Sequence, residues 1–214
     1  MVAIFQNRTR VDHRFRHIGE SLPPTGFDTL IIVSVGPEGP VALWAAADDR
    51  ADLLGRYEVP GWASFPETRT SSQPRGALAR YSAQSVTPEA LTILSGIPLA
   101  HPLVQPLPGG EYLVVGARCL WTEQGPELNA LVIGNDGEIK RAGTLGDAIA
   151  HLLVDGNGDV WTGYTDEGIF GNFGWGGSGP TPLGSAGIVR WSSHFEKLWE
   201  FQAVHDYWPL TAMP

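Results

Sequence analysis

One segment of the sequence combines side chains of the kinds that hold a polar ligand. It lies within residues 164–177 and carries two carboxylates, an amide and two aromatic rings: Asp166, Glu167, Asn172, Phe173 and Trp175. Carboxylate and amide oxygens accept hydrogen bonds from a ligand such as a sugar, and aromatic faces cover its apolar side. The segment therefore predicts a binding site for a small polar ligand. The competing interpretation is that its aromatic rings simply pack over the fold.

Three histidines form a second group with the potential for chemistry, because they recur at equivalent places in an internal repeat: His101, His151 and His205. Neutral imidazoles that converge can bind Zn²⁺ or Fe²⁺ and leave positions open for catalysis. Asp147 or Asp206 could then orient the ligating rings. The alternative is that each ring caps its own strand or bonds a neighbouring backbone group. The sequence thus leaves two predictions open: no cofactor, or a divalent transition metal held by these histidines.

Other catalytic signatures are missing from the sequence. It contains no P-loop, no dinucleotide-binding fingerprint, no Gly-x-Ser-x-Gly and no His-Glu-x-x-His. Cys119 is the single cysteine and lies in an apolar, strand-like run, which favours a buried structural thiol over a nucleophile. One cysteine cannot form an internal disulfide, and the start of the chain shows no signal peptide. We therefore expect a cytoplasmic protein.

The elements that must position these residues follow from a tandem repeat. Residues 100–104 and 110–113 match residues 150–154 and 158–161 as a strand, a turn and a second strand, and residues 30–44 are a looser copy. A second hairpin also recurs, at residues 78–82, 131–135 and 188–192. In its middle copy, Asn135, Asp136 and Gly137 predict a tight turn, because such residues tolerate positive φ. Each repeat therefore contains four short strands.

Repeats of about fifty residues with four strands are typical of β-propeller blades. We predict an all-β, propeller-like fold with an N-terminal segment over residues 1–27 and a repeat domain over residues 28–214. Its three blades span about residues 28–96, 100–145 and 150–202, and residues 204–210 are expected to form one further strand. Closed propellers usually have about four to eight blades, so this prediction implies an incomplete ring.

The turn in the third repeat resembles a known group of propellers. Residues 155–161, Asp-Gly-Asn-Gly-Asp-Val-Trp, followed by Gly163, are similar to repeats of regulator-type, NHL-type and streptogramin-lyase-like propellers. The resemblance is at the level of single repeats only. No catalytic residue of the lyases matches a position in this sequence. The resemblance implies that the connections over residues 45–76 and 164–186, both long, project from one face of the fold. Long loops on a rigid scaffold are where function concentrates.

Charge and composition narrow the range of partners. A formal net charge of −9 with 14 basic residues argues against a nucleic-acid-binding surface, which needs clustered cations. No apolar run is long enough to span a bilayer. We expect a non-enzymatic module whose loop-bearing face binds a small polar ligand or a protein partner. The alternatives are a metal-dependent lyase or hydrolase centred on the three histidines, and self-association through an open sheet edge.

Overall fold

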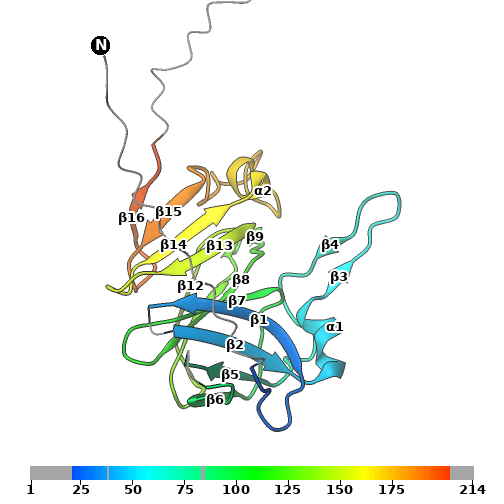
Figure 1. The fold of residues 1–214 in the computed structure, drawn as a ribbon. Coiled ribbons are helices and arrows are strands. Elements are labelled where there is room, and N and C mark those ends of the chain that lie inside the picture. The colour runs from blue at the N-terminus through cyan, green and yellow to red at the C-terminus, as the bar shows by residue number, and fades with distance from the viewer. Residues whose placement is uncertain (1–20, 38, 83–84, 203–214) are drawn as a thin grey trace, which may run out of the picture.

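The computed structural model describes residues 21–202, apart from residues 38, 83 and 84, and within that range the chain is all-β (Figure 1). Three four-stranded sheets follow one another along the chain. The first sheet contains β1 (Thr29–Gly36), β2 (Gly39–Ala45), β5 (Gly76–Arg80) and β6 (Ala90–Leu94). The middle sheet contains β7 (Pro102–Pro106), β8 (Tyr112–Gly116), β11 (Ala130–Ile133) and β12 (Ile139–Gly143). The third sheet contains β13 (Ile149–Val154), β14 (Val160–Tyr164), β15 (Ile188–Trp191) and β16 (Lys197–Glu200).

Every sheet is an antiparallel meander, in which each strand pairs with the next strand of its sheet along the chain. The predicted tight turn at Asn135, Asp136 and Gly137 is confirmed, since it joins β11 to β12 with Ile133 opposite Ile139. The interpretation of the three sheets as propeller blades stays a prediction. His205 and the strand expected over residues 204–210 lie outside the described residues.

Three strands of the middle sheet, β7, β8 and β11, are buried on both faces, which explains why they are mostly apolar, whereas its edge strand β12 is largely exposed. One face, with Val104, Val114 and Ile133, packs on the first sheet in one hydrophobic cluster. The opposite face, with Leu113 and Val132, packs on the third sheet in a second cluster. β7 also lies against both β1 and β13. The middle sheet therefore holds the first and third sheets in place on either side.

The two outward faces of this stack differ. On the first sheet, Phe27 from the preceding segment joins Ala42, Trp44 and Tyr81 in a small separate cluster. The Tyr81 hydroxyl donates a hydrogen bond to the carbonyl of Leu22, which ties that segment to the sheet. The outward face of the third sheet is more open: it exposes Leu153, Ile188 and Trp199 by about half. Among the described residues, the first sheet is thus partly capped and the third is not.

Shorter elements decorate the connections between strands. After β2 come a 3-10 helix (Ala47–Asp49), α1 (Arg50–Leu53) and a small hairpin of β3 (Arg56–Tyr57) and β4 (Phe65–Pro66). A second small hairpin, β9 (Trp121–Thr122) with β10 (Gly125–Pro126), follows β8, and α2 (Asp166–Phe170) follows β14. No helix in the described part of the chain is both long and apolar enough to cross a membrane.

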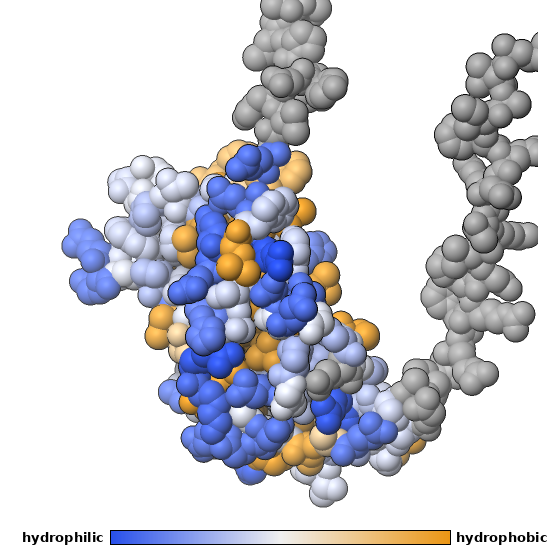
Figure 2. All heavy atoms as spheres, turned by 90° about the vertical axis from the view of Figure 1, so that its left-hand side faces the viewer, coloured by the Kyte–Doolittle hydropathy of each residue, from blue (hydrophilic) through white to orange (hydrophobic). Residues whose placement is uncertain are grey.

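Apolar side chains also reach the surface on the side of the molecule that carries the short turns. Figure 2 shows this side, where apolar residues form separate patches among hydrophilic ones. Val35, next to the β1–β2 turn, is 66% exposed, and Leu153 of β13 is 58% exposed. These patches are small and interrupted, as is common on soluble proteins.

Candidate functional site

The two long connections emerge at one end of the strands. Figure 1 shows the β3–β4 hairpin and α2 on the right, whereas the short β1–β2 and β13–β14 turns lie on the left. We call the right-hand side the loop-bearing end, and the segment from Arg56 to Pro66 the arm. Because both connections are anchored to strand ends, their exposed side chains are presented from a fixed scaffold.

A buried arginine organises the connection that contains α2. The Arg118 guanidinium donates two hydrogen bonds to the Asp147 carboxylate, both of 2.9 Å, and a third of 2.5 Å to Glu167. It also lies 4.3 Å from the centre of the Phe173 ring, in a cation–π contact. Burial raises the pKa of the Asp147 carboxyl, and the hydrogen bonds from Arg118 act in the opposite direction. Arg118 therefore joins α2 and its following loop to the middle sheet.

Several of the residues expected to bind a ligand are thus used inside the protein. Trp175 is buried, and its indole N–H donates a 2.8 Å hydrogen bond to the carbonyl of Cys119. Asn172 accepts a hydrogen bond from the backbone N–H of Phe173. Gly174 has φ +84, and a Cβ there would lie 2.2 Å from the carbonyl oxygen of Trp121, so this turn requires glycine. The loop that follows α2 is therefore packed against residues 119–121, which follow the middle sheet, and has a structural role there.

The outer side of the same connection remains exposed. Asp166 is exposed at the start of α2, and Phe170 at its end is 79% exposed. Of the predicted ligand residues, Trp175 is buried and Asp166 faces solvent. The other three, Glu167, Asn172 and Phe173, are partly exposed and contact the protein.

The arm carries the second exposed aromatic residue at this end. Tyr57 and Phe65 stack with their ring centroids 5.7 Å apart, and the Arg56 side chain donates a 2.9 Å hydrogen bond to the Ser64 hydroxyl. These contacts hold the hairpin together while its tip extends away from the sheets (Figure 1). Trp62, at that tip, is 76% exposed. Sequence reasoning missed Trp62, although a tryptophan beside Pro60 and Gly61 was a usable signal.

Two polar contacts fix the base of the arm. The Asp52 carboxylate accepts four hydrogen bonds from the backbone N–H groups and hydroxyls of Ser71 and Ser72. Burial acts to raise the pKa of Asp52, but these bonds outweigh it and hold the pKa at about 2. The His101 ring nitrogen Nε2 lies 2.8 Å from the carbonyl of Gly55, to which it can only donate. The Asp52 and His101 contacts restrain both ends of the segment that carries Trp62.

The histidines proposed as metal ligands have different surroundings. His101 is partly buried and uses Nε2 for the arm, whereas His151 is exposed and lies against Gly163 on the outward face of the third sheet. His205 is not among the described residues. Within residues 21–202, excluding residues 38, 83 and 84, no group of three or more His, Cys, Asp or Glu side chains could hold a metal ion. Asp147, expected to orient such ligands, binds Arg118 instead.

Cys119 is buried at the centre of this region, and burial raises the pKa of its thiol to about 12. A thiol with so high a pKa carries almost no thiolate at neutral pH, so it is a poor nucleophile. Its thiol donates instead to the carbonyl of Glu127, and its backbone N–H donates to Asp147. The environment of Cys119 thus suits a structural residue.

Comparisons of the sequence and the structure with known proteins identify no family for this chain. No family model matches the sequence, and no curated protein matches it. A protein of unknown function from Bacteroides caccae has a solved structure that aligns with 84% of this chain and 68% of its own, at 11% identity and a TM-score of 0.29. No conclusion about fold or function follows from a likeness of this strength.

Proposed function

We propose that this chain is a non-enzymatic binding module, with its three sheets arranged as propeller blades and its loop-bearing end docking a protein partner. The single observation that carries the proposal is the pair of exposed aromatic residues, Trp62 and Phe170, on two anchored elements at the same end. Exposed aromatic anchors on a rigid support are the residues that dominate protein interfaces. Aromatic side chains on a rigid support lose little conformational entropy on binding, so less of the favourable interaction free energy is offset.

The propeller-like arrangement is supported by the contacts between sheets. Three consecutive four-stranded meanders pack face to face, and their first strands β1, β7 and β13 lie side by side. Such an order places every connection between second and third strands at one end. The long connections 46–75 and 165–187 are two of these, which accounts for their shared position.

A protein partner is favoured over a small polar ligand by how the loop uses its polar groups. Glu167 is paired with Arg118, and the Asn172 side-chain oxygen accepts a backbone hydrogen bond. Both groups are already engaged by the protein, whereas Trp62 and Phe170 remain available for a broad surface. The metal-dependent alternative rests in part on His205 and stays a prediction, which metal analysis of untagged full-length protein will test.

A comparison of full-length variants tests this proposal. Protein bound from cell extract is quantified by mass spectrometry for the wild type, for Trp62→Ala with Phe170→Ala, and for Leu91→Ala with Ile93→Ala. Leu91 and Ile93 are exposed apolar residues of β6 and serve as the matched control. We expect a partner that the loop-end variant recovers at least about tenfold less well and the control recovers normally, as hot-spot losses imply. Equal recovery by all three proteins would overturn the proposal.

Self-association is a second proposal, favoured by the outward face of the third sheet. Leu153 and Trp199 are exposed there, and Trp199 lies next to Trp161 with ring centroids 5.8 Å apart. An apolar sheet face of this kind is stabilised when another sheet covers it. A second copy of this chain would provide that cover, and the size of the protein in solution reports it.

A further inference from the structure

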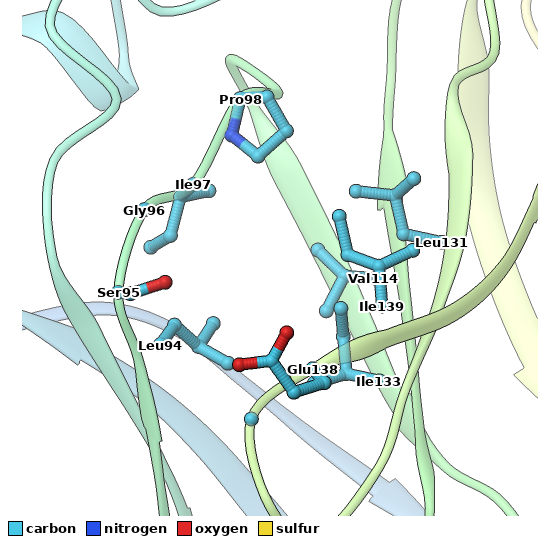
Figure 3. A pocket seen from close by; sticks show the side chains of 11 residues that line it. Leu94, Ser95, Gly96, Ile97, Pro98, Val114, Leu131, Ile133, Glu138 and Ile139 are labelled. Atoms are coloured by element: carbon cyan, nitrogen blue, oxygen red, sulfur yellow. The ribbon is translucent and has the colours of Figure 1, made fainter.

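A pocket lies between the first and middle sheets (Figure 3). Its volume is about 160 Å³. The connection from β6 to β7, residues 95–98, forms one wall, and strands β8, β11 and β12 form the other. The interior is apolar, with Leu94, Ile97, Val114, Leu131 and Ile133 all belonging to the buried core. The size is close to that of cavities of about 150 Å³ that hold one benzene molecule.

The walls of this pocket cannot easily collapse. Gly137 has φ +81, and a Cβ there would lie 2.1 Å from the carbonyl oxygen of Ile93, so the β11–β12 turn already touches the first sheet. Ile97 is fixed by a 2.9 Å hydrogen bond from its backbone N–H to the carbonyl of Pro74. Because both walls are fixed, the space stays open for an occupant rather than closing by repacking.

The mouth of the pocket carries unpaired polar groups. Figure 3 shows the Glu138 carboxylate and the Ser95 hydroxyl facing one another across the opening. Neither group has a hydrogen-bond or ion-pair partner among the described residues. The neighbouring Lys140 is committed to Asp136, with a nitrogen–oxygen distance of 2.5 Å. Glu138 therefore places an exposed carboxylate with no direct ion pair at the mouth of the cavity, and Lys140 interacts with it only at longer range.

From this juxtaposition we propose that the pocket binds a small primary ammonium compound with a compact apolar body, such as an aralkylamine or a branched alkylamine. The apolar body fills the space between Ile97 on one wall and the paired residues Val114 and Leu131 on the other. The ammonium group donates hydrogen bonds to Glu138 and Ser95, because a charged donor and a carboxylate form the strongest pairs of this type. Carboxylates of the same shape are rejected by the charge of Glu138, and neutral alcohols bind without the ion pair.

Titration with benzylamine, benzyl alcohol and benzoate tests the site, with binding followed through the methyl resonances of Val114, Leu131 and Ile133 by NMR. We expect saturable shifts with benzylamine, weaker binding of the alcohol and none of benzoate. Glu138→Gln should weaken benzylamine binding about tenfold and make the amine and the alcohol equal. Ser95→Trp, at the exposed mouth, should block both benzylamine and benzyl alcohol.

Glu196→Gln, an exposed carboxylate on the third sheet, is the control and should leave benzylamine binding unchanged. The proposal is overturned if these methyl groups do not respond to benzylamine, or if Glu138→Gln binds it as tightly as the wild type does. It is also overturned if benzoate binds comparably. Because this pocket shares no residue with Trp62 or Phe170, failure here leaves the proposed partner-binding function untouched.

Discussion

At the scale of single residues, Arg118 is a buried cation whose charge is balanced by buried or partly buried carboxylates. Its side chain is 10% exposed, that of Asp147 is 1% exposed, and the two form a bidentate pair. The guanidinium also donates a hydrogen bond to Glu167 and lies over the ring of Phe173. Replacing it would leave a buried carboxylate without a cation, which costs far more than losing a surface pair.

We therefore expect Arg118→Met to lower the free energy of unfolding by about 3–5 kcal/mol at pH 7. Urea denaturation measures this loss. Lys197→Met, which removes an exposed pair with Glu200, is the control and should cost less than about 1 kcal/mol. In Arg118→Met the pKa of Asp147 is raised further, so the loss should shrink as the pH falls and the carboxyl becomes protonated. A loss no larger than that of the control would contradict this role.

At the scale of elements, the sequence predicted hairpins better than it predicted the loop-bearing end. Turn residues such as Asn135 and Gly137 act locally, so the β11–β12 hairpin was readable. The arm was read as part of a long loop, because β3 and β4 have two residues each and β4 contains Pro66. The contact between Arg118 and Glu167 spans 49 residues and depends on how two sheets pack. No local pattern encodes such a contact.

The arm is expected to be dispensable for folding but required for binding. Residues 58–64 can be replaced by Asn-Gly, which suits a two-residue turn between Tyr57 and Phe65. The free energy of unfolding should change by less than about 0.5 kcal/mol, because these residues lie outside the core. Partner recovery should fall as it does for Trp62→Ala. A loss of about 2 kcal/mol or more in urea denaturation would show that the arm is structural instead.

At the scale of the whole molecule, the tandem repeat anticipated an all-β chain with three four-stranded units, since turn residues and alternating strands recur in each. It did not anticipate that the two ends of the stack differ. Phe27 and Tyr81 cover part of the first sheet, while Leu153 and Trp199 remain exposed on the third. This difference arises from a segment before the first repeat, which has no counterpart in the repeat pattern.

The exposed third sheet gives a prediction about association. If a second copy covers it, the sedimentation coefficient of the wild type should rise with concentration, and Leu153→Glu should abolish that rise because a buried charge opposes contact. Leu128→Glu, at a leucine that is 50% exposed and lies outside the third sheet, should behave like the wild type. A wild-type protein that stays monomeric at all concentrations would exclude stable self-association.

The central claim is that Trp62 lies at an interface with another protein, and site-specific photo-crosslinking tests it most directly. A photoreactive phenylalanine analogue is placed at position 62 in the full-length chain and, as a control, at Asn157 in the exposed β13–β14 turn at the opposite end. After irradiation in cells, we expect one discrete adduct of higher mass from position 62 and none from position 157. No adduct at position 62, or the same adducts at both positions, would contradict the account.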